Sequence, residues 1–271
     1  MGLPPARRAR QLLADHIAST RDDPALEERI DALSLLIRAR EGQGDDVAWL
    51  SDEELCDELL TLVLAGHETT ATAIGWACDL LAHNRAVAGR LRDDHDHAYV
   101  KATAKEVLRA RSVVYVSAGR HVLEPFEVGR WVIGPETLIL VDAQGVHGDP
   151  ELYPEPEAFR PERFLEQPPD GYAYIPFGGG AHRCLGAALA TLELELFIET
   201  LVERADLAPD GPPARAVRRS VTLAPGNDGR VRVAGVRSPA VAVAARSGRE
   251  LRRDRRLGPS SAPTDRRTIW I

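Results

Sequence analysis

The sequence has little sulfur, few aromatic rings and no long apolar run. Three cysteines in 271 residues are too few, and odd in number, for a disulfide framework, which favours a reducing, cytoplasmic setting. Aromatic residues make up 5% of the chain, so the core must rest on Leu, Val, Ile and Ala. The most apolar run, residues 59–66, is far shorter than a membrane-spanning helix, which needs about 20 residues. No membrane span is therefore expected.

Charge is also unevenly distributed. The net charge of -7 argues against general nucleic-acid binding. Residues 236–271 nevertheless contain nine arginines and only three acids, so the acidic body, residues 1–235, is followed by a basic tail. A solvated, disordered end is the favoured interpretation of this tail, and contact with nucleic acid or membrane is the alternative. The first ten residues are basic but lack the apolar stretch of a signal peptide.

Hydrophobic spacing predicts a mainly α chain with a minor β part, an α+β fold. Helices are expected at residues 6–20, 25–40, 52–83, 99–110 and 186–204. Ser51 and Glu54 form a capping box at the start of the long third helix. Strands are expected at residues 113–116, 126–128 and 137–141, with a hairpin over 221–233 that turns at 225–229. Residues 149–176 contain seven of the 19 prolines, which predicts an ordered coil meander without helix.

A glycine-rich loop over residues 177–186, Phe-Gly-Gly-Gly-Ala-His-Arg-Cys-Leu-Gly, delivers Cys184 directly before the last helix. A thiolate there would be stabilised by free backbone N–H groups and by the helix dipole. The glycines allow a flat ligand to approach the backbone. A phosphate loop would require Lys followed by Ser or Thr, which is absent. A buried structural cysteine is the alternative, and the spacing of Cys56 and Cys78 in the long helix indicates packing roles.

This loop resembles the haem-binding loop of the cytochromes P-450, whose pattern is F-x-x-G-x-[RH]-x-C-x-G. Five defining positions match: Phe177, Gly180, His182, Cys184 and Gly186. The resemblance implies a cytochrome P-450 fold and haem b, with the Cys184 thiolate as the axial iron ligand. It also implies that His182 donates a hydrogen bond to a haem propionate.

Residues 65–70, Ala-Gly-His-Glu-Thr-Thr, lie in the middle of the long helix. A glycine beside a helical threonine can open the helix locally and leave a groove, and an uninterrupted helix is the alternative. The segment resembles the oxygen-activation motif of the same family, [AG]-G-x-[DE]-T, with Ala65 and Gly66 at its start. That resemblance implies that Thr69 holds dioxygen and that Glu68 helps to deliver protons.

Two further features resemble the family. Glu106 and Arg109 share a helix face, and the resemblance implies a buried structural network that Arg163 of the meander completes. Arg120 stands where the family places an arginine on a haem propionate, and an exposed strand-end arginine is the alternative. His147 is expected to be structural.

Taken together, the resemblance implies a haem-thiolate monooxygenase that inserts one atom of O2 into an apolar organic substrate. A separate ferredoxin or flavin reductase would supply the electrons. The resemblance covers residues 6–233, whereas the family has further N-terminal helices and a W/H-x-x-x-R motif that this sequence lacks. Without those helices, the apolar face of the last helix has no evident partner. This face consists of Leu189, Leu192, Leu196, Phe197, Leu201 and Val202. We therefore expect a truncated or split gene product, with an inactive remnant that holds haem weakly or not at all as the alternative function.

Overall fold

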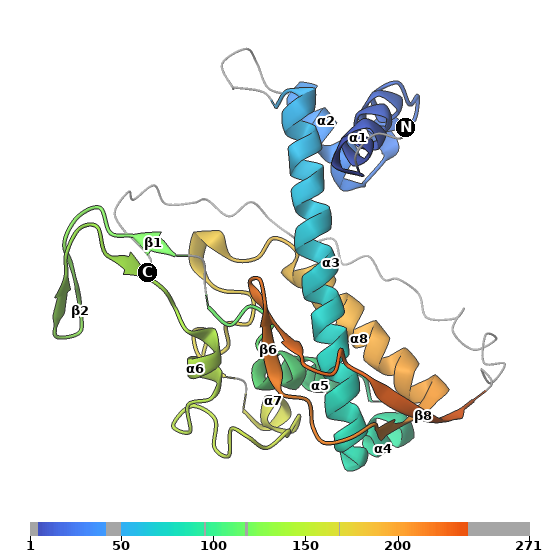
Figure 1. The fold of residues 1–271 in the computed structure, drawn as a ribbon, viewed down its shortest axis with the longest axis vertical. Coiled ribbons are helices and arrows are strands. Elements are labelled where there is room, and N and C mark those ends of the chain that lie inside the picture. The colour runs from blue at the N-terminus through green and yellow to red at the C-terminus, as the bar shows by residue number, and fades with distance from the viewer. Residues whose placement is uncertain (1–4, 42–49, 95, 117–118, 168, 238–271) are drawn as a thin grey trace, which may run out of the picture. The chain divides into compact units, whose positions relative to one another are not determined.

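The computed structural model describes residues 5–41, 50–94, 96–116, 119–167 and 169–237. The chain divides into two compact units, residues 1–68 and 69–271, and the long helix α3 (Asp52–His83) contains the boundary between them (Figure 1). Each unit is described separately. Residues 42–49, between the second and third predicted helices, and nearly all of the predicted basic tail lie outside the described residues.

The first unit packs α1 (Pro5–Arg21), the 3-10 turn η1 (Leu26–Glu28), α2 (Ala32–Glu41) and the start of α3. Its core consists of six buried residues: Ile17, Leu26, Leu33, Ile37, Leu55 and Cys56. Burial of these apolar side chains is the main source of its stability. Cys56 is therefore a packing residue, as its place in the helix predicts.

The predicted single helix over residues 25–40 is wrong. Arg29 is extended, with ψ of 146°, and Ile30 is 88% exposed instead of buried. The physical reason is Asp31, whose carboxylate accepts hydrogen bonds from the backbone N–H of Ser34 at 3.0 Å and from its hydroxyl at 2.9 Å. An aspartate that satisfies these donors starts a new helix, so α2 begins at Ala32.

Helix α3 begins and ends at the predicted residues. The hydroxyl of Ser51 accepts from the backbone N–H of Glu54 at 3.2 Å, and the Glu54 carboxylate accepts from the backbone N–H of Ser51 at 2.6 Å. This reciprocal pair satisfies two N–H groups at the helix start. The helix continues as α-helix through Gly66 and Thr69. The expected local opening of the helix is therefore not present.

The second unit is built on α5 (His97–Ala110) and α8 (Ala187–Arg204), which pack against each other and, through α8, against α4 (Arg85–Asp94). Its largest fully buried apolar side chains, each less than 2% exposed, are Trp76, Leu81, Tyr99, Leu194 and Ile198. The sequence prediction missed α4, because only two of its residues, Val87 and Leu91, are buried. Two short helices, α6 (Ala143–His147) and α7 (Arg163–Glu166), flank and interrupt the meander.

The strands form four two-stranded antiparallel ladders within the described residues. The pairs are β1 (Arg120–His121) with β4 (Leu138–Ile139), β2 (Phe126–Val128) with β3 (Trp131–Ile133), β5 (Ala205–Pro209) with β8 (Val231–Val236), and β6 (Ala216–Arg219) with β7 (Thr222–Pro225). The meander is coil apart from α7, so the expectation that it contains no helix is wrong for those four residues.

Two strand predictions need correction. Residues 113–116 form no strand, because the carbonyl of Val113 accepts a hydrogen bond from the distant Leu223 N–H at 2.8 Å and only one isolated bridge, from Val116 to Asp142, is present. Residues 221–233 do turn after Pro225, whose carbonyl accepts from Asp228 N–H at 3.0 Å. However, β7 pairs with β6 and β8 pairs with β5, so the two arms of the turn do not form the predicted hairpin.

Trp76 connects α3 to this sheet region, and its loss should destabilise the second unit. Its ring is fully buried and its Nε1–H donates to the carbonyl of Leu223 at 2.8 Å. We expect Trp76→Phe to lower the free energy of unfolding by about 1–3 kcal/mol, because the partly buried Leu223 carbonyl loses its donor and the buried ring site loses volume. Urea unfolding of the full chain measures this. The matched control is Trp131→Phe, at a ring that is 62% exposed, where a change within about 0.5 kcal/mol is expected. Equal losses in both variants would contradict the assignment.

Candidate functional site

The loop over residues 177–186 is fixed at one end and open at the other. The carbonyl of Phe177 accepts a hydrogen bond from the backbone N–H of Cys184 at 2.9 Å, and the Phe177 ring packs against the main core. Gly178 and Gly180 have φ of +68° and +66°, a conformation that residues with a Cβ rarely adopt. The loop thus folds back on itself and presents Cys184, whose side chain is exposed.

A groove of about 410 Å³ lies beside Cys184. Its walls come from the loop, from the first turns of α8 and from α5, and include Lys101, Arg183, Leu185, Thr191, Leu192 and Glu195. A Cβ added at Gly178 or Gly180 would meet no atom within 4 Å, so the space over the loop is open. An exposed thiol above an open glycine backbone fits a flat ligand with a metal at its centre, because a thiolate can ligate iron from one face. The residues present therefore fit a haem.

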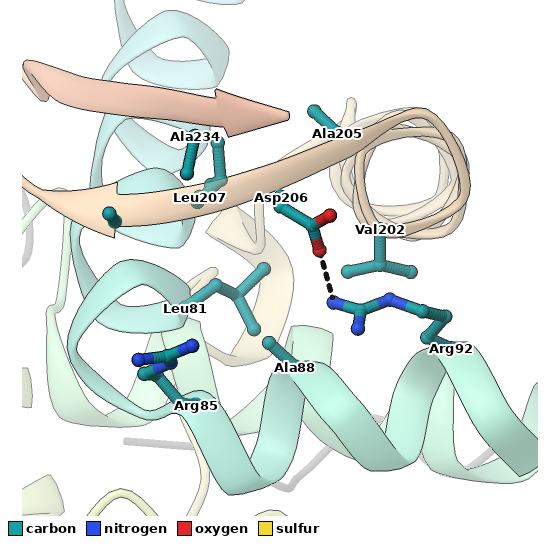
Figure 2. Close-up of a pocket in the computed structure, with 10 residues that line it drawn as sticks. Leu81, Arg85, Ala88, Arg92, Val202, Ala205, Asp206, Leu207 and Ala234 are labelled. Carbon is teal, nitrogen blue, oxygen red and sulfur yellow. Dashed lines mark ion pairs between the residues drawn. The ribbon is translucent and has the colours of Figure 1, made fainter. Parts of the chain in front are cut away.

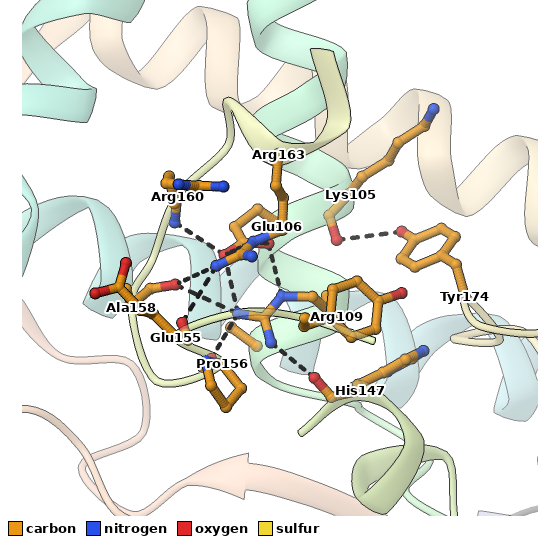
Figure 3. A network of polar contacts seen from close by, with 12 residues as sticks. Lys105, Glu106, Arg109, His147, Glu155, Pro156, Ala158, Arg160, Arg163 and Tyr174 are labelled. Atoms are coloured by element: carbon orange, nitrogen blue, oxygen red, sulfur yellow. Dashed lines mark hydrogen bonds and ion pairs between the residues drawn. The ribbon is translucent and has the colours of Figure 1, made fainter. Parts of the chain in front are cut away.

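Glu106, Arg109 and Arg163 lie together in the interior of the second unit (Figure 3). The Arg109 guanidinium donates to the two carboxylate oxygens of Glu106 at 2.7 and 2.9 Å. Arg163 Nε donates to the same carboxylate at 3.2 Å. The side chains are at most 6% exposed, so one buried carboxylate is shared by two cations. Such a group is costly to leave without its partner.

The network also binds the backbone of the meander. Arg109 donates to the carbonyls of His147 and Pro156, both at 2.8 Å, and Arg163 donates to the carbonyl of Pro154 at 3.1 Å. The backbone N–H of Arg160 donates to Glu106 Oε1 at 2.9 Å. These bonds attach the meander, which leads into the Cys184 loop, to α5. Sequence reasoning missed them because main-chain donors and acceptors leave no side-chain pattern.

His147 is fully buried beside this network. The backbone N–H of Ile175 donates to its Nε2 at 3.0 Å, so Nε2 carries no proton and Nδ1–H donates to the hydroxyl of Ser112 at 2.8 Å. Burial, with repulsion from Arg109, lowers the pKa of His147 to about 4. The neutral His147 ring thus connects residue 112 to residue 175, which lies two positions before the loop. This is the structural role expected for His147.

The remaining predicted residues belong to several different elements. Thr69 is half-buried and is the first residue of the second unit. Glu68, the last residue of the first unit, is exposed, and so are Ala65 and Gly66. Arg120 is exposed in β1, where it donates to the carbonyl of Gly119 at 3.2 Å. His182 is exposed in the 3-10 turn η2 (Gly180–His182), and Gly186 caps α8. The structure thus joins the network residues to one another and the loop residues to one another.

Comparison with known proteins identifies the family. The sequence pattern of the cytochrome P-450 family matches residues 6–228. This chain belongs to the cytochrome P-450 family. It is 43% identical over 220 residues to cytochrome P-450 137 of Mycobacterium tuberculosis, covering 80% of this chain and 45% of the relative. It is 36% identical over 219 residues to cytochrome P-450 138 of Mycobacterium bovis, covering 79% and 49%.

Solved structures agree with this assignment. A cyanobacterial cytochrome P-450 with bound retinoic acid has a TM-score of 0.71 and 30% identity, over 84% of this chain and 56% of that one. A zebrafish cytochrome P-450 with progesterone has a TM-score of 0.70 and 25% identity, over 81% and 56%. The chain spans about half the length of the curated relatives it matches. These matches confirm the predicted α+β cytochrome P-450 fold.

Two features are absent from the residues that the structure describes. No helix there is both long and apolar enough to cross a bilayer. No three His, Cys, Asp or Glu side chains there come together in a group that could hold a metal ion.

The apolar face of α8 is partly covered, contrary to expectation. Val202 is buried, and Phe197 and Leu201 are half-buried. Leu189, Leu192 and Leu196 are 61%, 50% and 52% exposed, as expected. One side of α8 thus belongs to the core of the second unit, and the other remains open.

Removing the shared carboxylate tests the network. We expect Glu106→Gln to lower the free energy of unfolding by about 3–5 kcal/mol, because two buried guanidinium groups lose their counter-ion. Chemical denaturation of the full chain measures the loss. The control is the exposed Glu124→Gln, which should change stability by less than about 0.5 kcal/mol. A Glu106 variant as stable as the control would show that the ion pairs contribute nothing.

The depressed pKa of His147 predicts a specific pH dependence. The unfolded ring binds a proton near pH 6.5, whereas the folded ring does so near pH 4, so the unfolded state holds more protons between these values. The contribution to stability is therefore complete above about pH 6.5 and falls, by about 3 kcal/mol in total, as pH drops toward 4. Unfolding free energies of wild type and His147→Gln, measured from pH 7.5 to 4, should converge as pH falls. A control variant, His121→Gln at an exposed position, should have the same unfolding free energy as the wild type at each pH. A difference between wild type and His147→Gln that stays constant with pH would refute the prediction.

Proposed function

We propose that this chain acts as a haem-thiolate monooxygenase, with Cys184 as the axial ligand of haem b. The observation that carries the proposal is the exposed Cys184 thiol, which lines an open groove and is presented by a loop whose glycines adopt left-handed φ. A helix N-terminus follows directly at Ala187. Its free N–H groups favour a negative charge nearby, which suits a thiolate.

Two side chains would anchor the haem carboxylates. Arg120 and His182 are both exposed polar groups in the second unit. A guanidinium binds a carboxylate through two parallel hydrogen bonds, and an imidazole N–H adds a third donor. The Glu106, Arg109 and Arg163 network acts at a distance: it holds the meander, and through it the position of the Cys184 loop.

Thr69 and Glu68 would manage oxygen and protons. Haem, when bound, supplies the iron at which O2 is reduced by two electrons. The Thr69 hydroxyl would hold O2 and water by hydrogen bonds, and the Glu68 carboxylate would take up and pass on protons. The net reaction consumes one C–H bond, O2, two electrons and two protons, and yields one C–OH group and water.

The family supports a proposal for the substrate class and for the electron source. An apolar organic molecule is the proposed substrate, which the bound retinoic acid and progesterone of the two solved relatives support. A separate ferredoxin or flavin reductase is the proposed electron donor. The alternative is an inactive chain that holds haem weakly or not at all. The 89% exposed Leu185, beside Cys184, and the open side of α8 favour that alternative.

A spectrum tests the ligand. The full chain, loaded with haem, reduced and exposed to carbon monoxide, should give the thiolate-type absorption band, and Cys184→Ser should lose it. Cys78→Ser is the matched control, because Cys78 is half-buried in α3 and its pKa is raised to about 11 by burial, so it cannot supply a thiolate at neutral pH. The proposal would be overturned if both variants kept the band or if both lost it. Haem lost during size-exclusion chromatography of the wild type would favour the inactive alternative.

A further inference from the structure

A second cavity lies away from the loop residues, between α4, the end of α8 and the β5–β8 ladder (Figure 2). Its volume is about 270 Å³, just below the range of about 300–1,000 Å³ typical of pockets for drug-sized ligands. Its walls are mostly apolar and include Leu81, Ala88, Val202, Leu207 and Ala234. Leu81 and Val202 are buried core residues, so one wall of the cavity is set by packing of the second unit.

The rim of this cavity carries more positive than negative charge. Arg85 and Arg92 line it, with Asp206 as the only acid among the lining residues. A third cation, Arg237, donates to the same Oδ1 of Asp206 that Arg92 Nη2 approaches at 3.1 Å. One carboxylate thus faces three guanidinium groups. The pKa of Asp206 lies below its usual value, mainly because of the hydrogen bond from Arg237, with Arg92 and Arg85 adding attraction.

The two lining arginines keep donors available. The Arg85 side chain makes no hydrogen bond or ion pair with any residue that the structure describes. Arg92 uses Nη2 at Asp206, its Nη1 has no partner among the described residues, and its Nε is buried without one. A guanidinium in this state is suited to a second anion, because its planar N–H groups match the two oxygens of a carboxylate.

We propose that this cavity binds a small organic monocarboxylate, with its carboxylate between Arg85 and Arg92 and its apolar tail against Leu81 and Val202. The excess of cations favours an anionic group, and the apolar walls favour a hydrocarbon chain. The volume of the cavity limits the length of that chain. A bare phosphate would leave the apolar walls uncovered, and a neutral hydrocarbon would leave Arg85 and Arg92 Nη1 without acceptors. The site shares no lining residue with the groove at Cys184, so it is independent of the proposed monooxygenase activity.

The test uses sodium hexanoate and its neutral analogue hexanamide, titrated against the full chain at constant chloride and followed by saturation-transfer NMR and calorimetry. Hexanoate should bind, and hexanamide should bind at least about tenfold more weakly, because a charge-assisted pair is lost. Arg85→Gln should weaken hexanoate by about tenfold. This substitution breaks no side-chain hydrogen bond or ion pair within the described residues, so we expect the folded state to be retained, which thermal melting verifies. Arg130→Gln, an exposed arginine in the turn between β2 and β3, is the charge-matched control and should bind as the wild type does.

A second variant tests the apolar part. Ala88→Leu should fill the cavity and abolish hexanoate binding while both arginines remain, and thermal melting verifies that it is folded. Equal binding to the wild type and Arg85→Gln, equal binding of hexanoate and hexanamide, or no binding at all would each overturn the proposal. Cys184→Ser should leave hexanoate binding unchanged; loss of binding there would assign hexanoate to the haem groove instead.

Discussion

The carboxylate of Glu106 accepts hydrogen bonds from two guanidinium groups and one backbone N–H in the interior of the second unit. A buried charge with fewer partners would be unstable, so α5, α7 and the meander must keep their positions together. His147 extends the constraint, because its carbonyl accepts from Arg109 and its ring accepts from Ile175. The Cys184 loop starts two residues after Ile175. The thiol is therefore placed by a polar network that does not touch it.

Much of the helical architecture could be predicted from sequence. Helix α3 has its predicted bounds because a capping box at Ser51 and Glu54 is local and unambiguous. The prediction failed where a distant partner decides. Val113 lies in an apolar run typical of a strand, yet its carbonyl accepts from the distant Leu223, and β8 pairs with the distant β5 instead of with β7. Pairing between segments that are far apart in sequence leaves no local pattern.

The site shows the same division. The loop over residues 177–186 and the Glu106, Arg109 and Arg163 triad are visible in sequence because their side chains carry the motif. Two sets of contacts are not visible in the sequence, because neither has a fixed spacing. They are the bonds to the carbonyls of residues 147, 154 and 156 and the three arginines around Asp206. The open side of α8 and the exposed Leu185 are consistent with a chain that spans about half the length of its relatives. Leu185 and Leu192 therefore leave apolar surface exposed at the groove beside Cys184.

The main-chain bonds to the meander have a consequence for how this segment can evolve. Arg109 and Arg163 recognise carbonyl oxygens, which every amino acid supplies, so side chains at positions 154–158 can change with little effect on these bonds. Insertion or deletion of a single residue is different. It would displace the following carbonyls by about 3.8 Å, the spacing of consecutive Cα atoms, which is more than a hydrogen bond tolerates. The meander should therefore drift in sequence while its length between α6 and α7 stays fixed.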